Sequence, residues 1–324
     1  MSAVQEILYP CKIDRSMQEA QFFSASGSEP RPLIVCLHTW SYDHRQKTFA
    51  RYAELAQIKN WHMIFPKFRG PNWLPEGCGS EMVVSDLEDA VSYVKSTVAV
   101  DFSRVYLTGG SGGGHCSLLM AGRRPDLWTA VSAWCPISDL ALWHTQSKIR
   151  KNAYAEHIET ACGGIPGESG SALREARKRS PLTWLSNAAG IVPIDIGTGI
   201  HDGHTGSVPV GQAIRAFNLL AAPEDRISEA DIAFIEEKEQ IPGHLAAYFE
   251  DPAYGDRKIH LRKQSRLVRL TLFEGGHDML PEPAFDWLGR QSAGRTPDWS
   301  AGKAFTAFGN ANLGKLSKKG TFHV

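Results

Sequence analysis

The sequence predicts an α/β fold built on a mostly parallel, doubly wound sheet. Short apolar runs recur along the chain, and segments with apolar residues spaced near 3.6 lie between them. No long linker rich in proline, glycine or serine divides the 324 residues, a length that suits one large domain or two small ones. These observations favour one domain that carries insertions.

Six short apolar runs are predicted to be strands, because turn residues bound them. They cover residues 32–38, 62–68, 104–109, 130–135, 191–199 and 266–275. Helical spacing of the apolar residues predicts helices between these runs. The helices are expected over 46–58, 82–98, the stretch after Gly114, and 209–220. This alternation of strands and helices is typical of a parallel sheet.

Two segments are longer than a normal crossover and are predicted to be insertions. The first covers about 137–190, and the second, about 222–265, contains a helix that begins at Ser228. Ligands of α/β proteins bind beyond the carboxyl ends of the strands, so we expect both insertions to lie over that end. The prediction is a single domain over 1–295 and a C-terminal extension over 296–324.

Composition and charge exclude several classes of protein. The chain is 42% hydrophobic and 22% charged, which is typical of a globular protein. Lys and Arg together number 35, as do Asp and Glu, so no net charge attracts nucleic acid or an anionic membrane. The N-terminal residues lack the pattern of a secretory signal, and no run of 18 apolar residues occurs. We therefore expect a cytoplasmic protein with no nucleic-acid or membrane partner.

A glycine-rich turn supplies a nucleophile. The predicted strand over 104–109 runs into GGSGGGH, where Gly109, Ser111 and Gly113 form a G-x-S-x-G pattern before a predicted helix. Small neighbours at such a turn let the helix approach the strand and leave the serine oxygen exposed. The alternative is a phosphate-binding loop, but no Lys followed by Ser or Thr comes after these glycines. We predict that Ser111 is the nucleophile.

An acid and a base follow Ser111 in the order serine, acid, histidine. Asp202 comes after the predicted strand over 191–199, and His277 lies in a glycine-flanked loop after the predicted strand over 266–275. Both positions are at the carboxyl ends of strands. We predict that His277 accepts the proton of Ser111 and that Asp202 orients the imidazole ring.

Acyl transfer also requires N–H donors for the developing oxyanion. The residue after the nucleophile, Gly112, supplies one, and the segment LHTWSYDH (37–44) is expected to supply the other. We prefer the N–H of Trp40 to that of Thr39, because Trp40 lies two residues after His38. The alternative is that these residues merely terminate a strand.

Three residues are weaker candidates for substrate contacts. Arg69 either clamps a substrate oxygen or forms a structural ion pair. Trp73 and Trp143 lie in a loop and an insertion, where each either lines a pocket or packs. His115, one helical turn after Ser111, is expected to pack.

Several of these motifs together resemble the catalytic domain of the prolyl oligopeptidase family, within the α/β-hydrolases. The resemblance covers roughly residues 30–290 and rests on LHTW, FPKFRGPNW, GGSGGGH, ACGGIP…RKRSPLTWL, GIHDGHTGSVP and FEGGHD. It implies an α/β-hydrolase fold with Ser111, Asp202 and His277 in the family's three catalytic places. A propeller selects peptides in that family, whereas only 110 residues precede Ser111. The resemblance therefore supports the catalytic machinery more than a peptide substrate.

The expected function is hydrolysis through an acyl-enzyme, with activity that rises with pH around 6.5, give or take about a unit. The expected substrates are small-acyl carboxylic esters, including carbohydrate esters, and short peptides are the alternative. A metal-dependent hydrolase is a second alternative, because His38, His44, His201, His204 and His277 are available ligands. No H-E-x-x-H motif or paired cysteines occur, so no metal or cofactor is expected. A non-catalytic binding module is disfavoured because serine, acid and histidine are all present.

Overall fold

One nine-stranded sheet forms the centre of the computed structural model, which describes residues 4–167 and 170–303. The strands are β1 (Gln5–Pro10), β2 (Met17–Phe23), β3 (Arg31–Leu37), β4 (His62–Pro66), β5 (Val100–Gly110), β6 (Ala130–Trp134), β7 (Ile194–Gly199), β8 (Ile259–Ser265) and β9 (Val268–Phe273). Their order in the sheet is β1-β2-β4-β3-β5-β6-β7-β9-β8. The central strands from β4 to β9 run parallel, and the outer pairs are antiparallel. The prediction of a mostly parallel sheet is confirmed.

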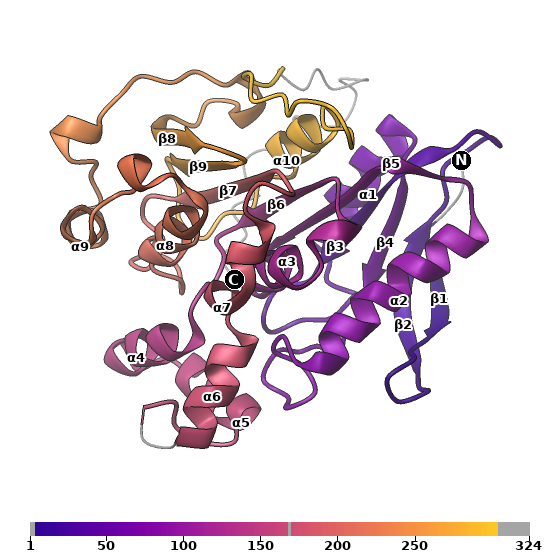
Figure 1. Ribbon diagram of the computed structural model, residues 1–324, viewed down its shortest axis with the longest axis horizontal. Helices are drawn as coiled ribbons and strands as arrows, with labels where there is room; N and C mark the ends of the chain where they lie inside the picture. The colour runs from indigo at the N-terminus through magenta and orange to yellow at the C-terminus, as the bar shows by residue number, and fades with distance from the viewer. Residues whose placement is uncertain (1–3, 168–169, 304–324) are drawn as a thin grey trace.

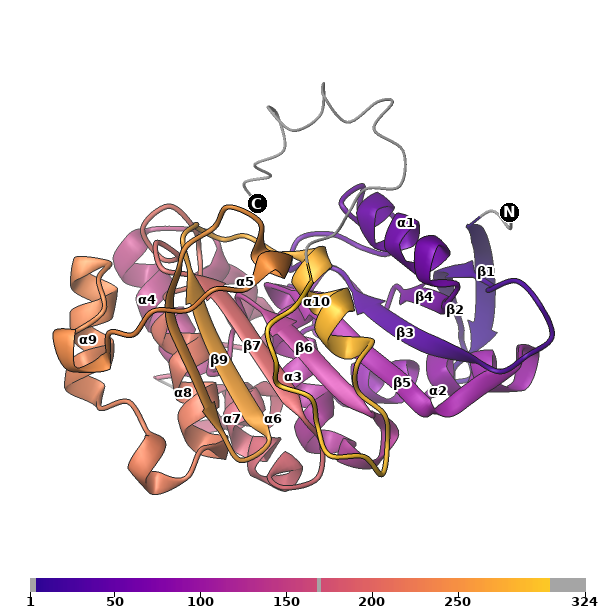
Figure 2. The same ribbon diagram turned by 90° about the horizontal axis from the view of Figure 1, so that it is seen from above.

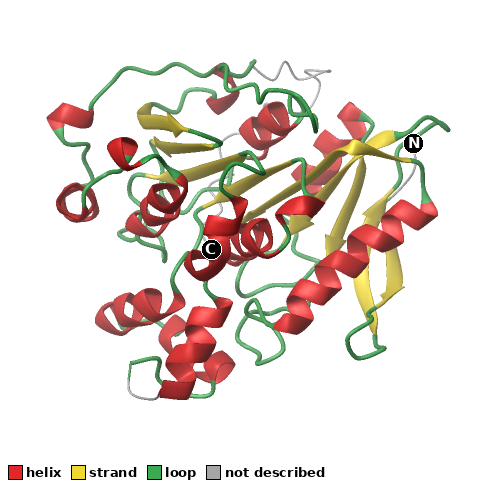
Figure 3. Ribbon diagram, in the orientation of Figure 1, coloured by secondary structure: helices red, strands yellow, loops and turns green. Residues whose placement is uncertain are grey.

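Helices cover both faces of this sheet, as Figures 1, 2 and 3 show. The helices packed against the sheet are α1 (Phe49–Lys59), α2 (Glu81–Thr97), α3 (Gly112–Arg123), α8 (Gly211–Leu220) and α10 (Pro281–Leu288). Helices α1 and α10 share one apolar cluster with the sheet, whereas α2, α3 and α8 share the larger cluster on the opposite face. The sheet is therefore doubly wound, as the alternation of apolar segments predicts.

The sequence predicts no range for β1, β2 or β8. β1 and β8 are the two edge strands, and β2 lies between β1 and β4; all three pair antiparallel with their neighbours. In β8 buried and partly exposed residues alternate, because an antiparallel strand can pack one face on the core and turn the other toward solvent. Such strands carry polar residues and lack the continuous apolar run by which the central parallel strands were recognised.

The first predicted insertion is helical. It contains α4 (Leu140–Arg150), α5 (Tyr154–Cys162), α6 (Gly170–Arg179) and α7 (Pro181–Trp184). Helices α4, α5 and α6 form a separate apolar cluster, which also includes Trp40 from the loop after β3. In Figure 1 these three helices project from one end of the sheet. The insertion thus packs directly against a loop that the sequence assigns to the site.

The second predicted insertion contains α9 (Glu229–Lys238) and ends in β8. The side chain of Ser228 caps α9, with its Oγ 3.1 Å from the N–H of Asp231. Because β8 belongs to the sheet, the last part of this segment is not a cover over the site. Of the predicted extension over 296–324, residues 304–324 lie outside the described part, so that boundary stays a prediction.

In the described ranges, no helix is both long and apolar enough to cross a membrane. All six cysteines are buried and unpaired.

Candidate active site

Ser111 lies at a sharp turn between β5 and α3. Its backbone has φ 57° and ψ −119°, a conformation that is uncommon for a residue with a side chain. The N–H of Ser111 donates to the carbonyl of Trp134 on β6 at 2.9 Å, and its carbonyl accepts from the N–H of His115 at 2.8 Å. The sheet on one side and the helix on the other therefore hold the strained residue in place.

The glycines around Ser111 permit a very close approach of three elements. A Cβ on Gly109 would lie 2.6 Å from the backbone of Gly113, and a Cβ on Gly113 would collide with the carbonyl of Leu37 on β3. A Cβ on Gly114 would lie 2.5 Å from the carbonyl of Trp134. These contacts are with backbone atoms, which cannot rotate away, so the G-x-S-x-G spacing is a packing requirement.

Asp202 and His277 meet at the carboxyl edge of the sheet. The strands that precede them, β7 and β9, are parallel neighbours. Oδ2 of Asp202 lies 2.7 Å from Nδ1 of His277, and both side chains are buried. Val208 donates its N–H to Oδ1 of Asp202 at 3.2 Å, and the hydroxyl of Thr198 lies 3.4 Å from Oδ2. The carboxylate is thus fixed against one edge of the imidazole ring.

Two opposing effects determine the pKa of His277. Burial would lower this pKa, but the charge of Asp202 and the contacts with Asp202 and Cys135 raise it well above 6.5. The other ring nitrogen, Nε2, is buried and has no hydrogen-bond partner within residues 4–167 and 170–303. That nitrogen is therefore available to take a proton.

The loop that carries His277 packs on the turn that carries Ser111. A Cβ on Gly110 would collide with the side chain of Met279. On the same loop, the carbonyl of Asp278 lies 3.3 Å from Sγ of Cys135. The structure therefore brings the three residues predicted to be catalytic to one edge of the sheet.

The loop after β3 lies against the residue that follows the nucleophile. A Cβ on Gly112 would lie 2.6 Å from both Cα and N of Trp40. The N–H of Thr39 already donates to Oε1 of Gln46 at 3.0 Å, whereas that of Trp40 has no acceptor in the described chain. This difference supports the choice of Trp40 over Thr39 as an oxyanion donor.

The structure corrects the expected substrate contact of Arg69. Its guanidinium lies 2.7 Å from Asp86 and 2.6 Å from Asp14, and 12% of its side chain is exposed. The ion pairs with these carboxylates raise the pKa of Arg69 further above its ordinary value. Arg69 therefore has the structural role that the sequence left as its alternative.

The expectation for Trp143 is also corrected. Its ring is fully buried, lies 4.8 Å from the ring of Trp40, and donates its N–H to the carbonyl of Ser207 at 3.0 Å. Trp73 differs, since it is partly exposed and its ring lies 4.8 Å from that of His157. Trp143 is a packing residue, and Trp73 stays a candidate for a substrate contact.

His115 packs as expected. Its side chain is fully buried and its Nδ1 lies 3.1 Å from the carbonyl of Ile137. Burial lowers the pKa of His115 to about 4.

The histidines do not converge on a metal centre in the described ranges. His201 lies between Glu239 and Glu274, and His44 contacts Glu6. The group of potential ligands found in these ranges consists of Cys135, Asp202 and His277, with ligand atoms within 4.8 Å of one another. This group is the acid and base already described together with a neighbouring thiol.

Cys135 lies in the site although no sequence motif points to it. Its position was detectable in principle, because it directly follows β6, the strand between β5 and β7. It also ends an apolar run, a pattern typical of a core thiol, and burial raises the pKa of this thiol.

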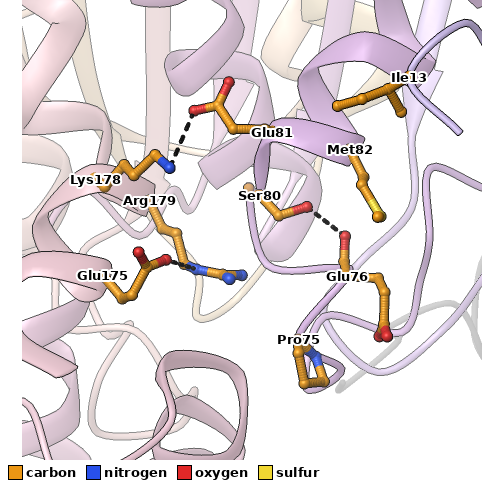
Figure 4. Close-up of a pocket in the computed structure, with 10 residues that line it drawn as sticks. Ile13, Pro75, Glu76, Ser80, Glu81, Met82, Glu175, Lys178 and Arg179 are labelled. Carbon is orange, nitrogen blue, oxygen red and sulfur yellow. Dashed lines mark hydrogen bonds and ion pairs between the residues drawn. The ribbon is translucent and has the colours of Figure 1, made fainter. Parts of the chain in front are cut away.

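A cavity of about 390 Å³ lies away from these groups, between the start of α2 and the end of α6 (Figure 4). Its charged walls pair with each other: Lys178 lies 3.7 Å from Glu81, and Arg179 lies 3.2 Å from Glu175. Ser111, Asp202 and His277 do not line this cavity. We therefore do not assign the substrate to it.

Known proteins resemble this chain in sequence and in fold. Residues 77–235 match the prolyl oligopeptidase family. Acylamino-acid-releasing enzymes 1 and 2 of Oryza sativa subsp. japonica are 27% and 26% identical to the chain, over 38% and 52% of its length. The alignments cover 17% and 23% of those enzymes, so this chain matches about a fifth of their length.

Solved structures with the same fold include peptidases. Pyrococcus horikoshii acylaminoacyl peptidase, in its orthorhombic crystal form, is 13% identical with a TM-score of 0.58, over 95% of this chain and 43% of that one. A puromycin-hydrolyzing peptidase of Mycobacterium tuberculosis is 16% identical with a TM-score of 0.57, over 90% and 40%. These similarities and the order of the strands show that the chain has the α/β-hydrolase fold and resembles the catalytic domain of the prolyl oligopeptidase family.

Proposed function

We propose that this chain hydrolyses its substrate through an acyl-enzyme on Ser111. The observation that carries the proposal is the buried contact of 2.7 Å between Asp202 and His277, at the edge where the strained turn presents Ser111. In the first half-reaction, Nε2 of His277 takes the hydroxyl proton while Oγ of Ser111 attacks the carbonyl carbon. His277 then donates that proton to the leaving group.

In the second half-reaction, water attacks the acyl-enzyme with His277 again as the base. The imidazolium that forms in each step lies against the carboxylate of Asp202, which stabilises its positive charge. The N–H groups of Gly112 and Trp40 donate to the carbonyl oxygen as it becomes negative. Because the site is buried, these charge interactions are stronger than they would be in water.

We further propose that the substrates are carboxylic esters with a small acyl group. The rings of Trp40 and Trp143 are fully buried and 4.8 Å apart, so they fill space next to the oxyanion donors. Only 3% of Ser111 is exposed. A bulky acyl group has little room there, whereas the partly exposed ring of Trp73 offers a flat surface for the alcohol, including a sugar.

Short acylated peptides are the second candidate substrates. The two Oryza enzymes are named for acylamino-acid release, and the Pyrococcus structure is named an acylaminoacyl peptidase. An amide requires the same nucleophile, base and oxyanion donors, so the substrate class must be measured.

A labelling experiment with a fluorophosphonate probe tests the mechanism. Wild-type protein should be labelled, and Ser111→Ala should lose both labelling and ester hydrolysis while it keeps its thermal unfolding temperature. Unlabelled wild-type protein, or near-normal turnover by Ser111→Ala, would refute the proposal.

The substrate class is tested with acetyl, butyryl, feruloyl and carbohydrate esters beside acylated peptide amides. Higher kcat/KM on the small-acyl esters supports the esterase proposal. Efficient cleavage of the peptides with no ester hydrolysis would favour the second candidate.

A further inference from the structure

Asn72 has a buried amide group whose nitrogen lacks a partner. It follows β4, and its side chain is fully buried. Its backbone N–H donates to the carbonyl of Trp40 at 2.8 Å, and its Oδ1 accepts from the N–H of Cys78 at 3.2 Å. Its Nδ2 has no hydrogen-bond partner in the described residues. A buried donor without an acceptor is costly, about 1–3 kcal/mol, so its retention requires an explanation.

The contacts of Asn72 fix which end of its amide faces the site. An N–H donor such as that of Cys78 needs an oxygen acceptor, so the amide oxygen must point toward Cys78. The NH₂ group must then point the other way, toward Gly112. A Cβ on Gly112 would lie 2.9 Å from Nδ2 of Asn72 and 2.6 Å from N of Trp40. Nδ2 of Asn72 and N of Trp40 therefore both lie within 3 Å of the position that a Cβ on Gly112 would take.

The loop that carries Asn72 is held rigidly. Phe68 and Arg69 both have positive φ, 33° and 64°, and the guanidinium of Arg69 is tied to Asp86 and Asp14. The hydrogen bond from Asn72 to Trp40 joins this loop to the loop after β3. A donor held in this way needs no reorganisation when charge develops on a substrate.

We infer that Nδ2 of Asn72 is a third donor to the oxyanion, beside the N–H groups of Gly112 and Trp40. This inference rests on the proposed acyl-enzyme mechanism, since it assigns Asn72 to the tetrahedral intermediates of that reaction. Nδ2 of Asn72 gains an acceptor when the substrate carbonyl oxygen becomes negative. A hydrogen bond to an ionised acceptor is about twice as strong as one to a neutral acceptor. Asn72 therefore stabilises the transition state more than the bound substrate.

Asn72→Asp is the decisive variant. The aspartate keeps an oxygen that accepts from the N–H of Cys78 but replaces the donor with a second oxygen. We expect kcat to fall about 10²–10³-fold with little change in KM, the usual effect of removing one oxyanion donor. The affinity for a trifluoromethyl ketone, which forms a tetrahedral adduct on serine, should fall by a similar factor.

A matched control and a second variant separate this role from a structural one. Asn60→Asp makes the same change at a partly exposed side chain that bonds to Ser26, before β4 rather than after it, and should keep wild-type kinetics. Asn72→Ala removes the donor without adding a charge, and its kcat should fall in the same way as that of Asn72→Asp.

The outcomes distinguish this inference from the proposed function. If wild-type protein reacts with the fluorophosphonate and hydrolyses esters while both Asn72 variants keep kcat within about threefold, the inference is wrong and the mechanism stands. The inference is also wrong if the Asn72 variants lose activity only in proportion to their loss of folded protein, and if the folded molecules bind the inhibitor as tightly as wild-type protein. Wild-type protein that neither reacts nor hydrolyses would instead refute the mechanism.

Discussion

Asp202 and His277 share a buried contact in which Oδ2 lies 2.7 Å from Nδ1. Burial lowers the pKa of His277 and the charge of Asp202 raises it, and the net result lies well above 6.5. Since His277 must be neutral to accept a proton, kcat/KM should rise with pH with a midpoint above 6.5. The sequence alone placed this midpoint around 6.5. A pH profile of kcat/KM measures the difference.

Replacement of Asp202 tests the cause of that shift. Asp202→Asn removes the negative charge and disfavours the required ring tautomer, so activity should fall by up to about 10⁴-fold. The midpoint of the residual activity should move to lower pH, because the raising effect of the charge is lost. A residual profile with the wild-type midpoint would show that another group controls the titration.

Two buried histidines should make the protein sensitive to acid. Burial lowers the pKa of both His38 and His115 to about 4, against 6.5 in the unfolded chain. Between these values the unfolded chain binds protons that the folded protein excludes, so the free energy of unfolding falls as pH decreases from 6.5 to 4. Each histidine contributes at most about 3 kcal/mol to this loss.

Urea unfolding at several pH values measures this effect. The variant His115→Gln should show a shallower decrease of the unfolding free energy than wild-type protein across that pH window. Equal slopes for the two proteins would contradict the assignment of His115 as a buried neutral group.

Gly112→Ala should inactivate the enzyme. The new methyl group would lie 2.6 Å from the backbone of Trp40, which cannot move without displacing the proposed oxyanion donor. We expect a loss of kcat of at least about 10²-fold. The control is Gly243→Ala, where a Cβ meets nothing within 4 Å and activity should be retained. Wild-type kcat in Gly112→Ala would show that the Trp40 loop is not held against Gly112.

Trp143→Ala should act on stability rather than on substrate binding. The ring is fully buried and packs on Trp40, so its removal should cost about 3–5 kcal/mol in the free energy of unfolding. At a temperature where the variant is folded, KM for carbohydrate and acetyl esters should change by similar factors. Trp73→Ala is the contrasting variant, and it should raise KM for the carbohydrate ester more. A selective KM effect in Trp143→Ala would restore it as a substrate contact.

Arg69→Ala should also destabilise the fold. It leaves Asp86, whose side chain is fully buried, without its cationic partner, which costs on the order of 3 kcal/mol. Arg45 pairs with Glu6 but is largely exposed, so Arg45→Ala should change the unfolding midpoint little. Equal unfolding midpoints for the two variants would contradict a structural role for Arg69.

The sequence predicts the centre of this molecule better than its edges, for a physical reason. Parallel strands such as β7 are buried on both faces and therefore appear as continuous apolar runs. The turn at Ser111 was recognisable since backbone collisions restrict its neighbours to glycine. The sequence indicates Asp202 and His277 because each follows a predicted strand. The carboxyl ends of parallel strands lie at the same edge of the sheet, so residues that follow neighbouring strands lie close together.

Long-range contacts explain what the sequence did not predict. Nothing within KFRGPNW shows that Arg69 reaches Asp14 and Asp86 or that the amide of Asn72 faces Gly112. The sequence leaves open whether Trp143 lines a pocket or packs, because no local pattern predicts that three helices of the insertion enclose its ring together with that of Trp40. Such contacts depend on the order of the strands in the sheet, because that order decides which loops lie side by side.

The groups at this site come from opposite parts of the sheet. Trp40 and Asn72 follow β3 and β4, whereas Asp202 and His277 follow β7 and β9, and Ser111 follows β5 between them (Figure 2). No two neighbouring strands therefore carry both the proposed proton acceptor and a proposed oxyanion donor. A partly folded chain with most of its helices formed would lack catalysis, so on refolding the helical circular dichroism signal should return before the first turnover, and ester hydrolysis should report that the pairing from β4 to β9 is complete.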